Sequence, residues 1–456
     1  MKRSSTKSCL LDPISIGCMM SSLQTRVSHV RGLSIIGQFA ILAEKALIFG
    51  HVQATKEPVL FQLRRPKKRQ FMQQNHSVLY WDDARYSSFP TVVKGDRDEL
   101  WVGFNWNSHT PLAHGVEGAA HSHSGGLAGG ATGHVELFSP DGGGSWFEEG
   151  KDDQYRECPE TLRSAVLSDG TQIRISRPAN VYPPERKEEF ARRGFAVEEF
   201  PERIHVEHSL QISRKRPGAS DWERRLLSSG QELPFFALIR NGTDLKSCVL
   251  ADDTIVSQVY GSASAGDPFR AWVLRSEDGG DTWEMVTMAY DGGEHPFNES
   301  SLLALPSGRI VAMVRTSSGS KAIPPEKKYL FQTHSDDGGK TWSKVSKTEM
   351  WGYPPHLLLL SSGDVLCSYG YRRAPYGVRA CRSRDGCATW EITDEIVLRD
   401  DGLTTDGTVT GKGTPADLGY PRTVELSDGS LFTVYYMTLG DSVTHVAATR
   451  WALDQA

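Results

Sequence analysis

The sequence predicts an all-β protein, a six-bladed β-propeller with four antiparallel strands in each blade. Three observations favour this fold class. A short motif containing Asp and Gly and ending in Trp recurs along the chain, and an apolar strand–turn–strand pattern recurs six times. The 456 residues also include 44 glycines and 11 tryptophans, which is typical of many short strands joined by tight turns. A closed array of such repeats can form one domain.

The recurring motif, here called the Asp box, has the form Ser-x-Asp-x-Gly-x-Thr-Trp. Intact copies span 276–283 and 335–342, a copy at 139–146 has Ser in place of Thr, a copy at 383–390 has Cys387 in place of the second Gly, and a degraded copy is expected at 213–222. The Ser and Asp side chains of such a turn bond backbone groups, while Gly takes positive φ angles. The Trp packs between neighbouring sheets. We therefore interpret the Asp-box carboxylates as structural.

The strand–turn–strand pattern sets the number of blades. Its copies span 92–104, 165–175, 248–260, 302–314, 358–370 and 424–436, with turns centred on Asp98, Gly170, Thr254, Gly308, Gly363 and Gly429. An Asp box, intact or degraded, follows each of the first five turns, and a closing strand is expected at 446–453. Each unit then supplies the four strands of a blade. The first strand of the ring is expected either from 77–81 or from the C-terminus.

Two insertions interrupt the repeats. Residues 107–133 are rich in Gly, His and Ser, which predicts a long loop, and the charged segment 183–202 contains spaced apolar residues that indicate a short helix. Long loops on a rigid scaffold often carry function.

Composition excludes several classes of protein. The net charge is −5, whereas a nucleic-acid-binding protein would carry a basic face. Residues 56–456 contain no run of 18 apolar residues, so no membrane span is expected in the mature chain. Five of the seven cysteines lie there without a CxxC spacing, so we expect free thiols and neither a zinc site nor a cofactor.

The first 55 residues differ from the rest. A basic start is followed by an apolar stretch at 33–49, and the small residues Val52 and Ala54 suit cleavage after Ala54. Glu44 and Lys45 interrupt the apolar stretch. Residues 1–55 are therefore either an export signal, which predicts a secreted or periplasmic protein, or a disordered or mis-started leader. Residues 56–456 form the propeller in either case.

The Asp boxes and strand–turn–strand units of residues 75–456 together resemble the sialidase (neuraminidase) superfamily of BNR-repeat propellers. The resemblance implies an active site on the channel face opposite the Asp boxes, in which a Glu activates a nucleophilic Tyr and arginines bind the substrate carboxylate. Segment 298–315 resembles one catalytic segment of that superfamily and implies that Glu299 is the activating base and Arg315 a carboxylate ligand. Segment 419–423 resembles another and implies that Tyr420 is the nucleophile.

Spacing supports this pairing independently. Counting back nine residues from the turns at Gly308 and Gly429 gives Glu299 and Tyr420, so both are expected to face one channel from equivalent positions. Counting forward seven residues from two of the six turns gives an arginine. The predicted substrate-binding residues are Arg315, Arg372, Arg177, His356 and Arg422.

The chemistry is consistent with a sugar that carries a carboxylate at its anomeric carbon. Such a sugar repels an anionic nucleophile, so a Tyr hydroxyl that passes its proton to a Glu suits it. Planar guanidinium groups can then hold the carboxylate through paired hydrogen bonds.

Two departures from the superfamily pattern affect the expected substrate. Ser88-Phe89-Pro90 stands where sialidases have Arg-Ile-Pro, so the first arginine is missing, and the expected acid/base Asp is not evident. The loop after the first repeat offers other groups for that role: His109, His114, Glu117, His121, His123 and His134. Because His titrates near neutral pH, it suits an acid/base role. These departures favour a terminal sugar other than sialic acid, such as a uronate or a deoxy sugar.

Three functions remain open. The first is an exo-acting glycoside hydrolase that uses Glu299 and Tyr420 to remove a terminal, acidic sugar from a glycan. The second is a polysaccharide lyase on the same scaffold, which would use His or Tyr as a base and release an unsaturated product. The third is a glycan-binding propeller without chemistry, in which Glu299 and Tyr420 would only form a hydrogen-bonded pair that fills the channel.

Overall fold

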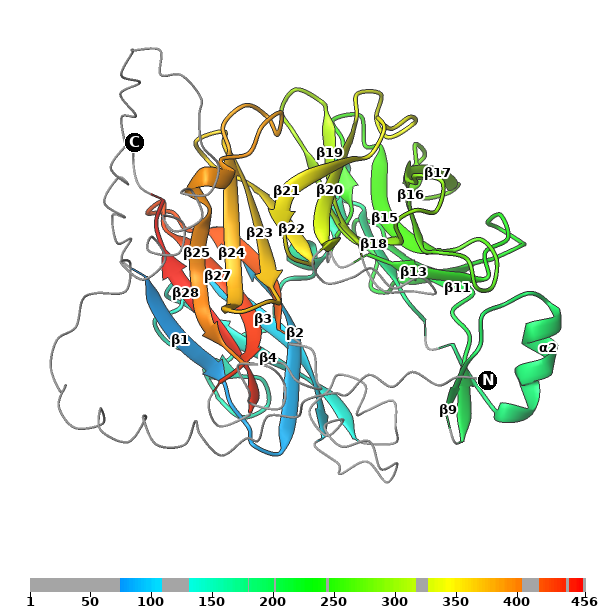
Figure 1. The fold of residues 1–456 in the computed structure, drawn as a ribbon. Helices are drawn as coiled ribbons and strands as arrows, with labels where there is room; N and C mark the ends of the chain where they lie inside the picture. Colours follow the sequence, from blue (N-terminus) through cyan, green and yellow to red (C-terminus); the bar gives the residue numbers. More distant parts are fainter. Residues whose placement is uncertain are drawn as a thin grey trace, which may run out of the picture. The chain divides into compact units, whose positions relative to one another are not determined.

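The computed structural model describes residues 74–108, 131–178, 180–200, 202–242, 246–316, 327–403, 418–439 and 443–453 (Figure 1). The predicted leader at 1–55 lies outside these residues. So do five candidates for the acid/base role: His109, His114, Glu117, His121 and His123.

The described residues are predominantly β-structure, in antiparallel sheets of mostly four strands (Figure 1). Sheet 1 contains β2 (Arg85–Lys94), β3 (Leu100–Ser108), β4 (Thr132–Ser139) and β5 (Phe147–Glu148). Sheet 2 contains β6 (Ala165–Val166), β7 (Gln172–Ser176), β11 (Ser209–Lys215) and β12 (Glu223–Ser228). Sheet 3 contains β13 (Leu238–Asn241), β14 (Cys248–Val249), β15 (Ile255–Ser262), β16 (Arg270–Ser276) and β17 (Glu284–Ala289).

The second half of the chain continues this arrangement. Sheet 4 contains β18 (Phe297–Ala304), β19 (Ile310–Thr316), β20 (Tyr329–Ser335) and β21 (Ser346–Trp351). Sheet 5 contains β22 (Pro355–Leu359), β23 (Val365–Tyr371), β24 (Tyr376–Ser383) and β25 (Ile396–Gly402). Sheet 6 contains β26 (Gly419–Glu425), β27 (Leu431–Thr438), β28 (Thr444–Trp451) and β1 (Asn75–Tyr80). The predicted antiparallel four-stranded units are thus confirmed, and sheet 3 has one additional short strand.

The first described strand belongs to the last sheet. In Figure 1, β1 (blue) lies beside β28 (red), and the two pair antiparallel from Asn75 opposite Arg450. The strand predicted at 446–453 is present as β28 (Thr444–Trp451). The sequence left two origins open for this strand, residues 77–81 or the C-terminus. The structure shows that it comes from the N-terminal segment, as β1.

From sheet 2 onward, each sheet packs on the next sheet in the sequence. Sheets 2 and 3, 3 and 4, 4 and 5, and 5 and 6 are in contact. Sheet 6 also contacts sheet 1 through β2, and the short 3₁₀ helix η2 (Glu160–Arg163) contacts both β2 and β6. The apolar core is therefore divided into layers that lie between consecutive sheets.

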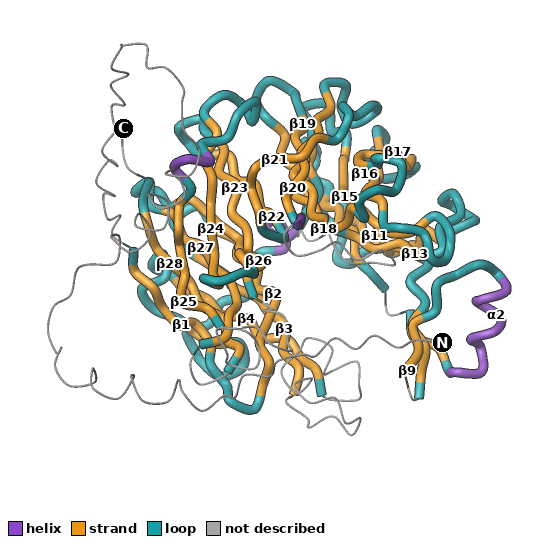
Figure 2. The backbone as a smooth tube through the Cα atoms, viewed as in Figure 1, coloured by secondary structure: helices purple, strands orange, loops and turns teal. Residues whose placement is uncertain are grey.

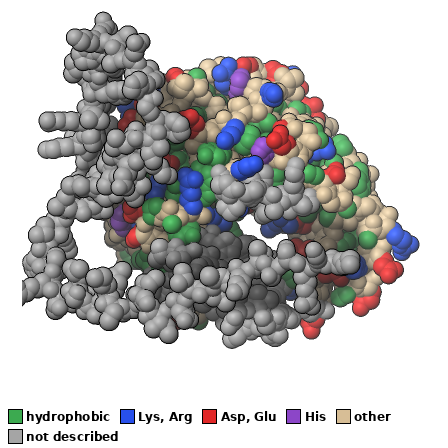
Figure 3. Space-filling view, viewed as in Figure 1, with side chains coloured by type: hydrophobic (Ala, Val, Ile, Leu, Met, Phe, Trp, Pro, Cys, Tyr) green, Lys and Arg blue, Asp and Glu red, His purple; other side chains and the backbone are tan. Residues whose placement is uncertain are grey.

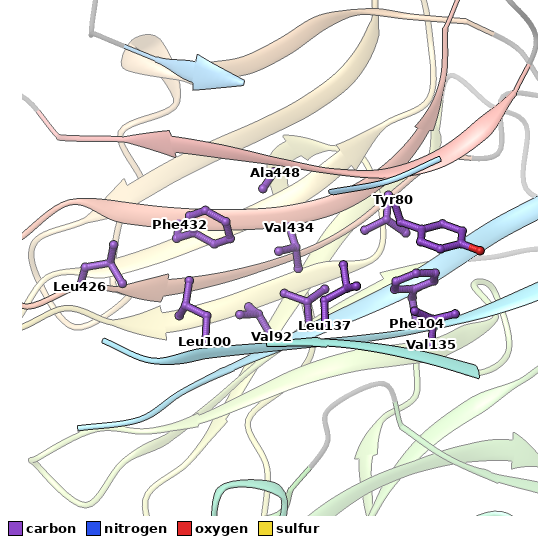
Figure 4. Packing of buried hydrophobic residues seen from close by; sticks show 12 residues of the cluster. Tyr80, Val92, Leu100, Phe104, Val135, Leu137, Leu426, Phe432, Val434 and Ala448 are labelled. Atoms are coloured by element: carbon purple, nitrogen blue, oxygen red, sulfur yellow. The ribbon is translucent and has the colours of Figure 1, made fainter. Parts of the chain in front are cut away.

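Figure 4 shows one such layer, between sheets 1 and 6. Val92, Leu100 and Phe104 from sheet 1 face Phe432 and Val434 from sheet 6, and all five are at least nine-tenths buried. Alternate residues of each strand point into the layer because side chains in a strand alternate between the two faces of the sheet. Full burial of side chains of this size stabilises a fold by about 1.5–3 kcal/mol each.

The Asp boxes form the turns that the motif predicts. In the box at 276–283, Asp278 accepts hydrogen bonds from the Ser276 hydroxyl at 2.8 Å and the Thr282 hydroxyl at 2.5 Å, and the Gly280 N–H donates to Ser276 Oγ at 2.9 Å. The Trp283 indole N–H donates to the Gly280 carbonyl at 3.1 Å, and its ring packs between sheets 2 and 3. The structural interpretation of these carboxylates is confirmed.

The turns of the strand–turn–strand units have a left-handed residue at the predicted centres, with one exception. Asp98 (φ 62°), Gly170, Gly308, Gly363 and Gly429 all have positive φ. In the third unit this residue is Asp253 (φ 64°) and not the predicted Thr254. The difference has a physical reason, because Asp tolerates the left-handed region far better than a β-branched residue does.

The insertion at 183–202 contains the predicted short helix, α2 (Lys187–Arg192), which is drawn in purple in Figure 2. Its first turn has two glutamates and its last turn an arginine, which complements the helix dipole. Flanking it are the 3₁₀ helix η3 (Pro184–Arg186) and a small sheet of β8 (Val181–Tyr182), β9 (Glu198–Phe200) and β10 (Arg203–His205). That sheet was not predicted. It packs around Phe190, Phe195 and Ile204.

The mixture of charged side chains on the surface agrees with the small net charge of −5. Figure 3 shows Lys and Arg side chains interspersed with Asp and Glu over the coloured part of one face. The five cysteines of the described chain are free thiols, as predicted. Among the described residues, no helix is long and apolar enough to cross a membrane.

Candidate active site

Sheets 1, 4 and 6 each have a β-bulge near the start of one strand. The register shifts fall between Ser88 and Thr91 of β2, between Phe297 and Ser300 of β18, and between Gly419 and Arg422 of β26. A bulge inserts one additional residue, bends the strand and redirects side chains. Phe89, Glu299 and Tyr420 lie within these three bulges.

The backbone at Tyr420 is strained. Tyr420 has φ 47° and Phe89 has φ 56°, a region that few residues other than Gly occupy. Both precede a proline, which normally keeps its predecessor extended. Gly419 before Tyr420 cannot be replaced freely, because a Cβ there would lie 2.6 Å from Gly370 Cα. Such strain costs about 1–3 kcal/mol and is concentrated at functional sites.

The structure brings the predicted site residues Tyr420, Glu299 and Arg315 together in one hydrogen-bonded group. The Tyr420 hydroxyl donates to Glu299 Oε1 at 2.7 Å. Arg315 Nη1 donates to Glu299 Oε2 and, at 2.9 Å, to the Tyr420 hydroxyl oxygen. The Arg315 and Glu299 side chains are 12% and 14% exposed, so the group is mostly buried but reaches solvent.

Burial and the neighbouring charges set the protonation of this group. Burial and the Glu299 carboxylate raise the pKa of Tyr420 well above its usual value, and Arg315 and Arg372 only partly oppose this. Burial works against the charge of Arg315, but Glu299 and Tyr420 raise its pKa overall. At neutral pH the group therefore consists of a neutral phenol and a guanidinium cation that both donate to one carboxylate.

Arg372 lies near Tyr420, and its predicted role in substrate binding stays a prediction. Its Nε donates to the Leu418 carbonyl at 2.8 Å and its Nη2 to the Tyr436 hydroxyl at 3.3 Å. Its guanidinium lies 5.1 Å from the Tyr353 ring centre and 5.7 Å from that of Tyr420. The two arginines outnumber the single Glu299 carboxylate, so the site carries an excess positive charge that suits an anionic ligand.

Phe89 completes the site, and the sequence reasoning did not single it out. Its ring centre lies 4.7 Å from that of Tyr420 and 5.4 Å from that of Tyr436, both in edge-on contacts. The signal was present in the sequence, because counting back nine residues from the turn at Asp98 gives Phe89. Ser88 stands where sialidases have the first residue of Arg-Ile-Pro, and its side chain is buried.

Arg177 lies in a neighbouring polar cluster. Its Nη1 donates to Glu207 at 2.8 Å, and Glu207 also pairs with Arg240. Burial and then the charge of Glu299 raise the pKa of the adjacent Tyr260, so this cluster is electrostatically coupled to the Glu299 group. Glu207, Arg240 and Tyr260 were not predicted because none of them lies in the counted positions of the repeat. The binding role of Arg177 stays a prediction.

His356 of β22 and Arg422 of β26 lie near each other. His356 Nδ1 accepts a hydrogen bond from the Thr423 N–H at 3.3 Å, and the ring lines a cavity of about 670 Å³ beside β2, β22 and β26. Burial and then the charge of Arg422 lower the pKa of His356 well below its usual value, so the imidazole stays neutral. Arg422 is buried within β26. Substrate binding by these two residues stays a prediction.

Elsewhere in the described chain, His134 and the cluster of Asp291, Glu294 and His295 contain side chains of the kinds that transfer protons or bind metal ions. His134, the described member of the acid/base candidates, has its Nδ1 at 3.2 Å from Asn105 Oδ1, and burial lowers its pKa. Asp291, Glu294 and His295 bring their ligand atoms within 4.8 Å of one another. His295 Nδ1 already lies 2.6 Å from Asp291, and this internal bond accounts for their proximity.

Comparisons with known proteins agree with this architecture. Residues 211–433 match the sequence model of the BNR repeat-like domain family, whereas no curated protein matches the chain. A Dyadobacter fermentans protein of unknown function shares the fold with a TM-score of 0.60 and 24% identity, over 83% of this chain and 98% of that one.

Two sialidase structures align with lower scores. A Streptococcus pneumoniae sialidase has a TM-score of 0.47 and 11% identity over 82% of this chain and 70% of its own. A Ruminococcus gnavus intramolecular trans-sialidase has a TM-score of 0.47 and 13% identity over 83% and 97%. The BNR match covers the stretch that carries Glu299, Arg315 and Tyr420 and three Asp boxes. Residues 211–433 therefore match the BNR repeat-like domain family, and the chain shares its fold with the Dyadobacter fermentans protein.

Proposed function

We propose that this protein is an exo-acting glycoside hydrolase that removes a terminal acidic sugar from a glycan. The observation that carries the proposal is the hydrogen bond of 2.7 Å from the Tyr420 hydroxyl to Glu299, formed where the backbone of Tyr420 is strained. Strain of this kind persists only where the surrounding structure enforces it. A purely structural Tyr–Glu pair would not require it.

The proposed reaction has two displacements. In the first, Tyr420 Oη forms a bond to the anomeric carbon, the glycosidic C–O bond breaks, and the phenolic proton passes to Glu299. The leaving oxygen takes a proton from an acid at the channel mouth. In the second, water attacks the anomeric carbon and passes a proton to the group that acted as the acid, the bond to Tyr420 breaks, and Glu299 returns the proton to the phenolate. Two inversions give net retention of configuration.

Charge favours an acidic substrate. Arg315 and Arg372 both lie within 6 Å of the Tyr420 ring centre, and their combined charge exceeds that of Glu299. A carboxylate on the sugar would be attracted to this site and would accept hydrogen bonds from the guanidinium groups. A neutral phenol avoids the repulsion that an anionic nucleophile would meet.

We also propose that the six sheets are the blades of a closed six-bladed propeller, with the site on the channel face opposite the Asp boxes. Two observations support closure. The apolar layer between sheets 1 and 6 resembles the layers between consecutive sheets, and η2 lies between β2 and β6. On this arrangement Phe89, Glu299 and Tyr420 project into one channel from equivalent bulges.

The activity is tested with purified protein and a panel of aryl sialosides, uronides and deoxyglycosides. We expect release of the aryl group from at least one acidic glycoside, and a loss of about 10²–10⁴-fold in kcat for Glu299→Gln. Glu349→Gln is the matched control, because Glu349 is exposed on β21 of the same sheet. Normal turnover by Glu299→Gln would overturn the site assignment.

The other functions give different results in the same experiment. An unsaturated product with ultraviolet absorbance would indicate a lyase. Binding of a glycan without turnover, unchanged by Glu299→Gln, would indicate a binding propeller.

Export is proposed as well, with residues 1–55 as the leader and 56–456 as the propeller domain. Expression of the full chain followed by N-terminal sequencing of the protein outside the cytoplasm should give a first residue after Ala54. Retention of the intact chain inside the cell would contradict this.

A further inference from the structure

Phe89 is the apolar member of the surface that a sugar would meet. The side chains of Phe89, Glu299, Arg315, Arg372 and Tyr420 are all partly exposed, whereas Tyr353 and Tyr436 beneath them are buried. Four of the five exposed members carry a charge or a hydroxyl. Phe89 alone among these five offers neither a donor nor an acceptor.

The position of Phe89 is imposed by the backbone. Its bulge in β2 matches the bulges that present Glu299 and Tyr420, and its φ of 56° has the same unusual sign as that of Tyr420. Pro90 after it has no N–H, so the bulge leaves no donor unpaired at that residue. The edge-on contacts with Tyr420 and Tyr436 then fix the direction of the ring.

The chemistry of this position discriminates against hydroxyl groups. A sugar hydroxyl placed against the Phe89 ring would lose its water without gaining a hydrogen bond, which is unfavourable. A CH or CH₂ group at the same place would lose nothing and would gain contact with the aromatic ring. An arginine side chain at this position would instead favour a polar or anionic substituent, because it would donate hydrogen bonds to it.

We propose that Phe89 determines the substrate specificity of the site, which selects acidic sugars that turn a deoxygenated edge toward the Phe89 ring. This inference rests on the proposed glycosidase function. The charged part of the site holds the carboxylate, and Phe89 excludes sugars that have a hydroxyl at the facing carbon.

The test compares 4-nitrophenyl glucuronide with its 2-, 3- and 4-deoxy analogues, and 4-nitrophenyl N-acetylneuraminoside with its 4-deoxy analogue. Within each pair the substrates differ by one hydroxyl. We expect one deoxy analogue to exceed its parent by roughly tenfold in kcat/KM with the natural protein. In Phe89→Tyr, whose ring has the same packing but offers a hydrogen-bond partner, that ratio should fall to about twofold or less.

Phe89→Leu is the matched control, because it stays apolar and should keep the preference for the deoxy analogue. A purely structural role of Phe89 would lower kcat/KM for every substrate alike and leave the ratio unchanged. An unchanged ratio in Phe89→Tyr, or no deoxy analogue better than its parent, would overturn the inference while leaving the glycosidase function intact.

A failure of the proposed function is distinguishable from a failure of this inference. If no substrate is turned over, the same ratio is measured as dissociation constants of the free deoxy and parent sugar acids by NMR titration. Tighter binding of a deoxy acid, lost in Phe89→Tyr, would support the inference without catalysis. Equal binding, or no binding of any of the acids, would overturn it.

Discussion

The Tyr420 hydroxyl is placed to lose its proton only when a reaction requires it. It donates to a carboxylate and accepts from a guanidinium at once. Burial and Glu299 raise the pKa of Tyr420, so the unliganded protein holds a neutral phenol. As a bond to carbon forms, the phenol becomes far more acidic, and Glu299 is already in hydrogen-bonding distance to take the proton. In the proposed reaction, the pair would combine an uncharged nucleophile with a base already in hydrogen-bonding distance.

Tyr420→Phe should abolish turnover while preserving the fold. The substitution removes only the hydroxyl, so the ring contacts with Phe89 and Tyr436 remain. We expect kcat to fall at least about 10³-fold, since the nucleophile is lost. The melting temperature should change by only a few degrees. Initial rates on the best glycoside of the panel and a thermal melt measure both. Substantial turnover by Tyr420→Phe would exclude Tyr420 as the nucleophile.

The site was predictable where it follows the repeat and unpredictable where it does not. Glu299 and Tyr420 come from equivalent positions of two sheets, so counting from the turns found both. Phe89 also lies nine residues before a turn, but its side chain has no group that could act as a nucleophile, an acid or a base. Counting from the turn at Gly170 also found Arg177. In the structure Arg177 pairs with Glu207, which lies just after the insertion at 183–202. Such pairings depend on contacts between segments that no spacing specifies.

At the scale of the element, each Asp box is a turn held by one carboxylate. Asp337 accepts from the Ser335 hydroxyl at 2.7 Å and from the Thr341 hydroxyl at 2.6 Å and backbone N–H at 2.9 Å. The hydrogen bonds from the Thr341 side chain and backbone lower the pKa of Asp337 to about 2. The corresponding bonds from Thr389 lower the pKa of Asp385. Each box is therefore strongest when its carboxylate is charged.

This predicts how stability depends on pH. Because the folded-state pKa of Asp337 lies below its unfolded value of 3.8, its contribution is fully present above about pH 4 and is lost as the pH falls through about 2. Because Asp337 is exposed, solvent screens its charge, and we expect it to contribute about 1 kcal/mol or less to the free energy of unfolding. Asp337→Asn should be less stable at pH 7 and should lose less stability between pH 7 and pH 2.5.

Urea unfolding at the two pH values measures this difference. Asp83→Asn is the control, because Asp83 is exposed and lies outside every Asp box. An identical pH dependence for Asp337→Asn and the natural protein would contradict the turn-carboxylate interpretation.

Elements that belong to the repeat were predicted well, and the inserted ones less so. The turns, the Asp boxes and the closing strand follow from local patterns of Gly, Asp and apolar residues. The three-residue strands β9 and β10 have no such pattern, because strands this short form only by packing around Phe190 and Ile204. The helix α2 beside them was predicted from a charged segment with interspersed apolar residues, of which Phe190 lies in the helix.

At the scale of the molecule, one polar contact recurs between sheets. The Ser168 N–H of sheet 2 donates to Asp253 of sheet 3 at 2.8 Å, and Ser361 of sheet 5 donates to Glu425 of sheet 6 at 2.7 Å. In each case a serine in the turn of one sheet is bound by a carboxylate from the next. The same contact joins the last sheet to the first, where the Ser427 N–H donates to Asp98 at 3.0 Å.

The contact between Asp98 and Ser427 therefore tests closure of the proposed propeller. Its partners are 329 residues apart in the sequence, and the hydrogen bonds from Ser427 are the main reason that the pKa of Asp98 is lowered. Asp98→Asn and Asp253→Asn form a matched pair, because both positions have positive φ, which Asn tolerates, and both bond the hydroxyl and N–H of a serine. If the ring is closed, each substitution should cost about 1 kcal/mol and leave a single cooperative unfolding transition. Loss of stability in Asp253→Asn alone would mean that sheets 6 and 1 are not joined in solution, and the six sheets would then form an open array.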